Sequence, residues 1–410
     1  MSKKLLFILG IFILGVSLLD VFLIYLNVDI PFSLLIIFFL FFSLFFMSYE
    51  RIALFKDKNF VFYFLILLIS LVSTTLINTN YQITSDYLLY YVRVLQIFVI
   101  LISFYLVVNN INFSKFVKVN TLIYVVGALV YIIIFWREHL LVRPEGVLGI
   151  SDHVAFLAII LFNLEETKKS RYIALIFSFL LLLFYSSFTS ITFFIFTILV
   201  NIIYSIYLKR NIILKIFTTL VLICLIVCAL VFYIQISKKP IQLQGNSVIV
   251  NTINNYLIRI HYVINLEDSS LNARLILFKE GFKVLKEKPI LGEFMYEYRV
   301  FGTTGSYMHN MLSYWAEYGL INFLLIFVPY FFYLFRSYKY FVKYDDKVLK
   351  ALFFSGIYIT LIILFSRSYV SMTFWVHYGL LMPSVLKFER EISNQQVTYI
   401  NEKKNLYQTL

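Results

Sequence analysis

Residues 310–335 read NMLSYWAEYGLINFLLIFVPYFFYLF, a nearly continuous run of apolar and aromatic side chains. Because a helix of about 20 apolar residues spans the hydrocarbon core of a bilayer, this run is long enough to cross a membrane. Its polar residues gather in the first part, which begins with Asn310 and contains Glu317. The stretch therefore predicts a transmembrane helix whose first turns carry polar groups.

The rest of the chain has the same character on both sides of this run. Of the 410 residues, 61% are apolar and 14% are charged, and the mean hydropathy is +0.87. This composition lies outside the range of soluble proteins and predicts an all-α polytopic membrane protein with a single membrane domain over residues 1–410. Twelve transmembrane helices are expected, near residues 5–26, 31–49, 60–78, 88–108, 121–136, 154–164, 172–187, 189–207, 216–234, 310–335, 351–369 and 373–387.

Lysine and arginine are distributed unevenly between alternate loops. The first apolar segment follows Ser2-Lys3-Lys4 and is long enough to span a bilayer, so we expect an uncleaved anchor that starts inside. The short outer segments hold only Arg137, Arg143 and Arg367, and the inner loops hold many more basic residues. The positive-inside rule then places both termini in the cytoplasm. The same bias accounts for most of the net charge of +13, which gives no support for nucleic-acid binding.

Two segments are expected on the outer side, residues 136–153 and the longer loop 235–309 between the ninth and tenth helices. Within the longer loop, apolar residues recur at helical spacing and lysines form a second stripe, which predicts an amphipathic helix. Ser269 or Ser270 can cap its start, and Pro289 follows its end. We expect it to lie flat on the outer leaflet; an ordinary helix packed on the membrane domain with a solvated basic face is the alternative. Its apolar stripe is Leu271, Leu275, Phe278, Phe282 and Leu285, and its basic stripe is Lys279, Lys283 and Lys286.

Two arginines near the outer surface are candidate phosphate ligands. Arg143 lies in the sequence Arg143-Pro144-Glu145-Gly146, where proline and glycine fix a turn. Arg274 lies in the first turns of the predicted amphipathic helix. A guanidinium group carries a permanent charge and planar donors that suit bidentate contact with phosphate. The alternative for each is an interfacial arginine that reaches toward lipid headgroups.

His309 and Asn310 open the helix predicted over residues 310–335, after a glycine-rich approach. His309 is the candidate general base, because neighbouring arginines would favour its neutral imidazole. Asn310 and Glu317 are about two helical turns apart and form a polar seam on one face that could support a site. A structural histidine at the membrane interface is the alternative.

Further charged or titratable residues lie within the predicted helices. We expect Arg93 to form a buried ion pair with Asp20 or Glu317, with contact to a substrate as the alternative. Arg367 lies at the outer end of the eleventh helix, where it either joins an anion site or anchors the helix. His377 is expected in the helix core.

Sequence motifs of several enzyme classes are missing. The chain has no Asp-x-Asp, no HExxH, no Walker glycine loop and no Gly-x-Ser-x-Gly elbow. Cys224 and Cys228 lie four residues apart in one predicted helix and are interpreted as core residues rather than metal ligands or a disulfide. Asp345-Asp346 falls in a lysine-rich inner loop and is interpreted as a solvated charge patch. No metal ion or other cofactor is therefore expected.

The outer motifs resemble those of the bacterial O-antigen polymerase and O-antigen ligase superfamily. The matching motifs run from about Arg274 to Leu320, with a further short match in the preceding outer loop. They are Arg143-x-x-Gly146, the Arg274 helix ending in Lys288-Pro289-Ile290-Leu291-Gly292, and His309-Asn310 followed by Ala316-Glu317-Tyr318-Gly319-Leu320. The layout is also similar, with about twelve helices, both ends inside and one large outer loop before the third-last helix.

The resemblance implies roles for the outer residues. Arg143 and Arg274 would bind the diphosphate of an undecaprenyl-linked glycan, and His309 would act as general base on the acceptor sugar. Asn310 and Glu317 would support them. Members of the superfamily often carry a Ser-Arg pair near the outer end of the seventh or eighth helix, where this chain has Ser187-Phe188-Thr189-Ser190. Arg367 is the candidate replacement for that arginine.

The resulting expectation is a metal-independent, inverting membrane glycosyltransferase of the bacterial inner membrane. It would act as a polysaccharide polymerase on the outer face, with membrane lipids and a chain-length regulator as partners. One alternative is an O-antigen ligase that passes the glycan to lipid A core or another surface acceptor. Another is a lipid-linked oligosaccharide flippase or transporter. A third is a structural role in which the outer loop only docks a partner protein.

Overall fold

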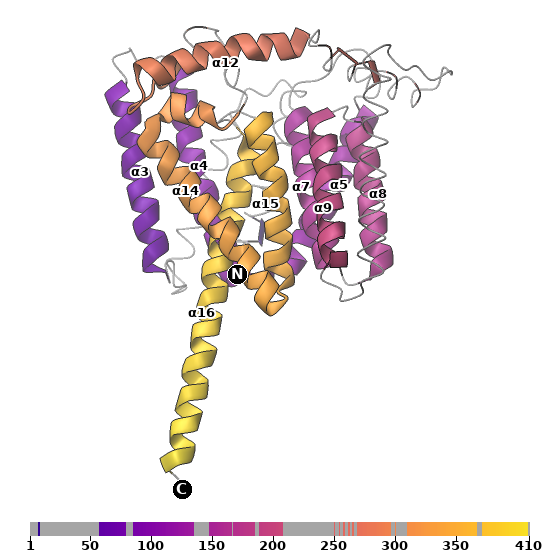
Figure 1. The fold of residues 1–410 in the computed structure, drawn as a ribbon, viewed down its shortest axis with the longest axis vertical. Helices are drawn as coiled ribbons and strands as arrows, with labels where there is room; N and C mark the ends of the chain where they lie inside the picture. Colours follow the sequence, from indigo (N-terminus) through magenta and orange to yellow (C-terminus); the bar gives the residue numbers. More distant parts are fainter. Residues whose placement is uncertain are drawn as a thin grey trace.

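The computed structural model describes residues 57–78, 85–134, 147–165, 167–184, 188–207, 269–296, 310–366 and 371–408, with a few scattered positions besides. These residues are helical almost throughout, and no strand occurs among them. Figure 1 shows the helices packed as a bundle. They are α3 (Lys58–Asn78), α4 (Ser85–Asn110), α5 (Phe113–Ile134), α7 (Val147–Leu164), α8 (Lys168–Phe184), α9 (Phe188–Tyr207), α12 (Ser269–Glu287), α14 (Leu312–Tyr344), α15 (Lys347–Phe365) and α16 (Met372–Gln408).

The bundle has the properties of a membrane-embedded helical protein. Four described segments are long and apolar enough to cross a membrane. Their outward-facing side chains include large apolar groups such as Ile69, Val328 and Phe365, each more than half exposed. In water such a surface would be costly, whereas lipid tails accommodate it. The four segments are Lys58–Thr75, Thr189–Tyr207, Leu312–Tyr344 and Lys347–Phe365, and two shorter apolar helices cover Val94–Asn110 and Gly149–Leu164.

The predicted membrane helices that fall within the described residues coincide with observed helices, although several ends differ. Helix α5 begins at Phe113 rather than near residue 121, and α7 begins at Val147 rather than near residue 154. Helix α16 continues to Gln408, far beyond the predicted end at residue 387, and projects from the bundle in Figure 1. The predicted ends were placed where the apolar run stops, and the observed helices continue into the polar residues beside it. The predicted helices at 5–26, 31–49 and 216–234 lie outside the described residues.

Close packing in the centre of the bundle involves aromatic rings and small residues. Tyr314 of α14 meets Phe374 and Trp375 of α16, with ring centroids 5.6 and 6.0 Å apart. A Cβ atom on Gly356 would lie 2.3 Å from the side chain of Leu334, so α14 and α15 approach closely there. Contacts of this kind hold helices together in lipid, where apolar surface gains little from association.

The amphipathic helix α12 lies crosswise over one end of the bundle (Figure 1). Its bounds, Ser269–Glu287, agree with the helix predicted between the serines at 269 and 270 and Pro289. The segment that follows it folds back onto α14 through backbone contacts: Glu293 N–H donates to Ala316 C=O at 2.8 Å, and Leu320 N–H donates to Ile290 C=O at 3.0 Å. The helix is thus fastened to the start of α14.

Two glycines allow this backbone contact. Gly292 has φ +66°, and Gly319 has φ +80° with ψ 169°, so helical geometry is interrupted inside α14. A Cβ atom on Gly319 would lie 2.2 Å from the carbonyl oxygen of Ile290. Conformations of this type are accessible to glycine and strained for other residues.

Ion pairs and caps fix the opposite end of the bundle, which we call the inner end. Arg390 of α16 donates to Asp57 at 2.6 Å, and Arg336 of α14 donates to Glu389 at 2.5 Å. Between α14 and α15, Asp345 adopts a left-handed conformation and the Asp346 carboxylate accepts from Leu349 N–H at 2.8 Å. The interpretation of Asp345-Asp346 as a solvated charge patch is therefore wrong for Asp346, which caps a helix.

A smaller ion-pair cluster joins α5 to the turn between α7 and α8. Lys118 Nζ lies 3.0 Å from Glu165 Oε1, and Ser170 Oγ donates to the other carboxylate oxygen at 2.9 Å. Partial burial opposes ionisation of Glu165, but these two hydrogen bonds outweigh it and hold its pKa below the usual value. The cluster therefore contributes stability above the ordinary pKa of a glutamate and loses it as the pH falls through the depressed pKa.

We predict that Gly319→Ala destabilises the protein by about 2–4 kcal/mol, because the added Cβ atom meets the Ile290 carbonyl and the backbone conformation becomes strained. The melting temperature of the detergent-solubilised full chain would report the loss. Asp345→Gly is the control, since glycine suits a left-handed cap, and we expect it to melt at or slightly above the wild-type temperature. Equal melting of Gly319→Ala and wild type would contradict this account of the α12 attachment.

Candidate functional site

The predicted site residues are only partly within the described structure. Arg143, His309 and Arg367 lie outside the described residues. Arg274 lies in α12, but its side chain is outside the description, as is that of Arg93. That Arg143, Arg274 and His309 lie close together therefore stays a prediction. Asn310 and Glu317, the two supporting residues, are described.

Asn310 precedes Met311, the N-cap residue of α14, and bonds to the first turn of this helix. Its side-chain oxygen accepts from Leu312 N–H at 2.9 Å, and its backbone carbonyl accepts from Ser313 Oγ at 2.8 Å. The first of these bonds satisfies a backbone N–H that the start of a helix leaves without an intrahelical partner. Asn310 therefore fixes the direction in which the chain leaves residue 309 and enters the membrane helix.

Glu317 is completely buried and fastens the loop after α12 to α14. Its Oε1 accepts from Met295 N–H at 2.7 Å. Met295 is itself buried and has φ +66°, an unusual conformation for a residue with a side chain. The carboxylate thus stabilises a strained turn that forms part of the end of the bundle covered by α12. The predicted polar seam has a structural role at this position.

The surface of α12 mixes basic and apolar side chains. Lys279, Lys283 and Lys286 are exposed, as predicted, and large apolar side chains such as Ile276 and Phe282 are exposed beside them. Lys286 Nζ lies 5.1 Å from the centre of the Phe282 ring. A surface of this composition suits the boundary between lipid tails and headgroups, where both kinds of side chain are accommodated.

The predicted apolar stripe of α12 is correct only in part. Leu285 is buried and Phe278 is partly buried, but Leu275 and Phe282 are exposed. The buried side of the helix instead contains Gly281 and Val284. The apolar stripe was expected to face the lipid boundary as a whole. Instead, part of it packs against the protein and part of it is exposed.

Next to this surface, the loop carries its own charged contacts. Lys288 Nζ lies 3.1 Å from Glu293 Oε2. Tyr296 donates to Glu280 Oε2 at 3.4 Å, and burial, reinforced by the Glu280 carboxylate, raises the pKa of the Tyr296 phenol. The tyrosine therefore stays a neutral hydrogen-bond donor at physiological pH.

A buried polar cluster inside the bundle was missed by the sequence interpretation. We call it the polar belt. Ser190 of α9 donates to Asp152 Oδ1 at 2.5 Å, and Tyr358 of α15 donates to the same oxygen at 3.4 Å. Ser151 Oγ lies 3.2 Å from Ser190 Oγ. All of these side chains are buried.

His153 extends the polar belt toward α16. Its Nδ1 lies 3.0 Å from Gly149 C=O and 2.9 Å from Thr373 Oγ1, and its ring stacks on Tyr124 of α5 at 5.5 Å. Tyr124 stands midway along α5, whereas Ser190 and Thr373 lie in the first turns of α9 and α16, so the belt extends from near one end of these helices toward their middle. A carboxyl group and an imidazole inside the bundle are costly unless bonded, and are commonly functional in membrane proteins.

The polar belt was missed because residues up to 153 were assigned to an outer loop. Helix α7 begins at Val147, which places Asp152 and His153 inside the bundle. The available signal was the sequence Gly149-Ile150-Ser151-Asp152-His153, which is followed without a break by an apolar helical segment. Two titratable residues that directly precede an apolar run can belong to the same membrane helix.

His377 lies in the core, as predicted. Its Nε2 lies 2.9 Å from Leu352 C=O, and its Nδ1 lies 3.2 Å from the Tyr330 hydroxyl. Both side chains are buried. Within the described residues, no group of three or more His, Cys, Asp or Glu side chains is arranged to hold a metal ion. The chemistry that the described polar groups offer is hydrogen bonding and proton exchange.

No protein-family model and no curated protein matches this chain. The resemblance in the outer motifs therefore stays a prediction. The function must be argued from the geometry of α12, its attachment to α14 and the polar belt.

We predict that Glu317→Ala lowers the free energy of unfolding by about 1–3 kcal/mol, because it leaves the buried Met295 N–H without its acceptor. Glu317→Gln retains a side-chain oxygen and should lose less than half as much. Thermal unfolding and limited proteolysis at residues 288–296 would measure both effects. Equal losses for the two variants would show that the negative charge, and not the hydrogen bond, is what matters.

We predict an energetic coupling of about 1–3 kcal/mol between Asp152 and Ser190, whose short hydrogen bond is buried. A double-mutant cycle with Asp152→Asn and Ser190→Ala, followed by SDS-driven unfolding in mixed micelles, would measure it. The control cycle replaces Ser190→Ala by Ser337→Ala, whose hydroxyl bonds Leu334 C=O in its own helix. A coupling no larger than that of the control would contradict the belt.

Proposed function

We propose that this protein is a membrane glycosyltransferase that polymerises a polysaccharide from undecaprenyl-diphosphate-linked repeat units. The observation that carries the proposal is the position of α12. This basic amphipathic helix lies across one end of an apolar bundle and exposes Lys279, Lys283 and Lys286 beside apolar side chains. A substrate with an isoprenoid tail and a diphosphate offers both of the surfaces that such a helix binds.

The proposed topology has twelve membrane helices with both termini in the cytoplasm of a bacterium. The end that carries α12 is then the outer face of the inner membrane, and the projecting part of α16 is cytoplasmic. The distribution of lysine and arginine supports this orientation, because Arg336, Lys339 and Arg390 are at the end opposite α12.

The proposed reaction is a single displacement at the anomeric carbon of the donor glycan. The hydroxyl of the acceptor repeat unit attacks this carbon, and the bond from the carbon to the diphosphate oxygen breaks. His309 accepts the hydroxyl proton, and undecaprenyl diphosphate leaves with the bonding electron pair. Arg143, Arg274 and Arg367 stabilise the departing diphosphate, so no metal ion is required.

The described residues support this scheme through the start of α14. Asn310 sets the direction of the chain directly after His309, and Glu317 holds the loop that joins α12 to the same helix. Both bonds help to fix the start of α14, which the candidate base directly precedes in the sequence. A displacement reaction is faster when the reacting groups are held in a fixed geometry, and supporting residues contribute to this.

A ligase is the closest alternative within the same chemistry. It would transfer the glycan to lipid A core or another surface acceptor, and the described residues carry nothing that distinguishes the two acceptors. The partners of the polymerase would be membrane lipids and a chain-length regulator.

A transporter of lipid-linked oligosaccharides is the second candidate, and the polar belt is the observation that favours it. Asp152 and His153 are buried inside the bundle, and His377 with Tyr330 lies in the core as well. Titratable groups along such a path are typical of transporters.

We predict that the purified full chain in liposomes elongates undecaprenyl-diphosphate-linked repeat units with no other protein present. Arg274→Ala and His309→Ala should each lower the elongation rate by about 100-fold or more, because they remove diphosphate stabilisation and the base. The length distribution of the product on a gel, with Lys339→Ala at the inner end as the control variant, gives the measurement.

The same samples distinguish the candidates. Product that appears only after lipid A core is added would favour the ligase. Movement of a labelled lipid-linked oligosaccharide across the liposome membrane without any elongation would favour the transporter. Full elongation by correctly inserted Arg274→Ala and His309→Ala would exclude both enzyme schemes.

A further inference from the structure

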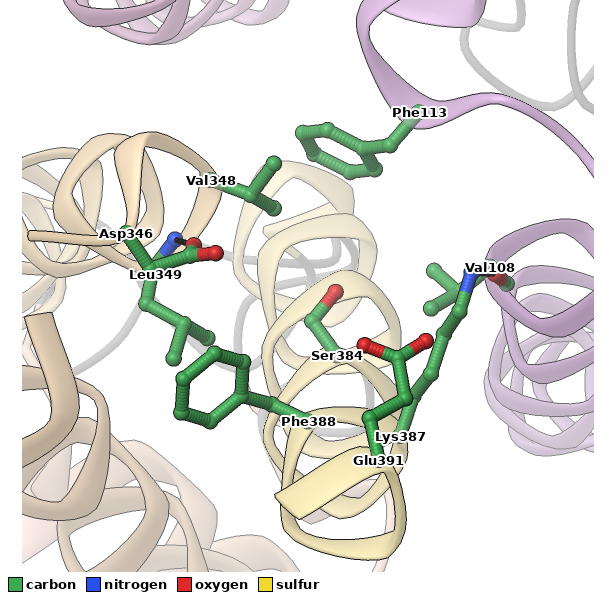
Figure 2. Close-up of a pocket in the computed structure, with 9 residues that line it drawn as sticks. All are labelled: Val108, Phe113, Asp346, Val348, Leu349, Ser384, Lys387, Phe388 and Glu391. Atoms are coloured by element: carbon green, nitrogen blue, oxygen red, sulfur yellow. Dashed lines mark hydrogen bonds between the residues drawn. The ribbon is translucent and has the colours of Figure 1, made fainter. Parts of the chain in front are cut away.

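A pocket of about 150 Å³ opens at the inner end of the bundle, the end opposite α12. We call it the inner pocket. It lies where the last turn of α4, the start of α5, the start of α15 and the middle of α16 come together (Figure 2). Its apolar walls include Phe113, Val348 and Phe388. No predicted site residue lines it.

Two carboxylates face the inner pocket from different helices. Figure 2 shows Asp346 on one side and Glu391 on the other, with Ser384 between them. One oxygen of Asp346 accepts from Leu349 N–H at 2.8 Å, which leaves its second oxygen available. Within the described residues, Glu391 has no ion-pair partner, and it is exposed. The pocket therefore presents negative charge on two sides of an apolar space.

The one lysine in the wall is already engaged. Lys387 Nζ donates to Val108 C=O at 3.0 Å, in the last turn of α4. A cation at this position stabilises the carbonyl end of a helix. With one ammonium group against two carboxylates, the wall keeps an excess of one negative charge, so it favours a cation over an anion.

Ser384 adds an independent sign that the pocket is built for a polar ligand. The residue is only 6% exposed, and its hydroxyl has no hydrogen-bond partner among the described residues. A buried hydroxyl without a partner costs free energy, and a ligand or a water that hydrogen-bonds to it removes that cost. In Figure 2 it stands on the pocket floor between the two carboxylates.

We propose that the inner pocket binds an organic cation, an ammonium or guanidinium group on a short alkyl chain, between Asp346 and Glu391. The cation donates to both carboxylates and to Ser384 Oγ, and the alkyl chain lies against Phe388 and Phe113. The volume suits a group of this size and is too small for a nucleotide or a sugar chain. The group can belong to a free amine or to a lysine or arginine side chain of a protein segment on that side of the membrane.

The binding test uses the full chain in lipid nanodiscs with n-butylammonium and n-butylguanidinium as probes. Saturation-transfer NMR, with empty nanodiscs subtracted, should give saturable binding with a Kd in the millimolar range, about what a few heavy atoms can supply. Butyrate and n-butanol, which have the same chain with an anionic or neutral head, should bind at least about tenfold more weakly.

Three variants locate the site. Asp346→Asn keeps an oxygen that can cap α15, and Glu391→Gln changes an exposed residue, so both should fold and melt like wild type. Each should weaken n-butylammonium binding at least about threefold, and the double variant at least about tenfold. Ser384→Ala should weaken binding as well, without lowering the melting temperature. Lys339→Ala, outside the pocket, should bind like wild type.

Two capped tripeptides, Ac-Gly-Lys-Gly-NH2 and Ac-Gly-Arg-Gly-NH2, distinguish the sources of the cation. Tighter binding of a tripeptide than of the matching butyl probe supports a basic side chain of a protein, and the reverse order supports a free amine. The proposal is overturned if none of these probes saturates below about 50 mM. It is overturned equally by butyrate binding more tightly than n-butylammonium, or by affinities that the carboxylate variants leave unchanged.

Discussion

Hydrocarbon offers no hydrogen bonds, and this one constraint decides where polar groups stand throughout the described bundle. Many of the described polar side chains inside it bond to each other or to backbone carbonyls. Asp152 bonds to Ser190 across α7 and α9, and His377 bonds to the Tyr330 hydroxyl and to a carbonyl of α15. Each bond of this kind between two helices also fixes their relative position, because the alternative is an unsatisfied group in an apolar surrounding. The hydrogen bonds that pair buried polar groups thus also hold the helices in their arrangement.

The attachment of α12 follows the same logic at the membrane boundary. A loop that leaves a surface helix must place its backbone against α14 without losing hydrogen bonds. The chain does so by using glycine at two facing positions, which lets the Ile290 carbonyl reach the backbone of Leu320, and by sending the Glu317 carboxylate to Met295 N–H. The result is a basic, partly apolar helix held in a fixed place over one end of the bundle.

Much of the fold could be predicted from the sequence, because apolar runs of membrane length indicate their helices directly. The bounds of α12 also followed from its capping serines and from Pro289. The division of its apolar stripe did not, since periodicity shows which residues share a face and not which neighbour that face meets. The polar belt escaped because Asp152 and His153 precede the apolar run of α7, and a charge at the edge of a run is read as loop. Contacts between helices distant in sequence, such as Tyr358 with Asp152, leave no local signal at all.

Helix α16 links both ends of the molecule in one piece. Its first turns carry Thr373 and His377 of the buried centre, and farther along it carries Lys387 of the inner pocket and the ion-paired Arg390. Pro383 interrupts the helical hydrogen bonds between these two groups. Because proline has no N–H, the carbonyl of Gly379 one turn earlier lacks its usual helical donor, and α16 bends more easily here than a helix without proline.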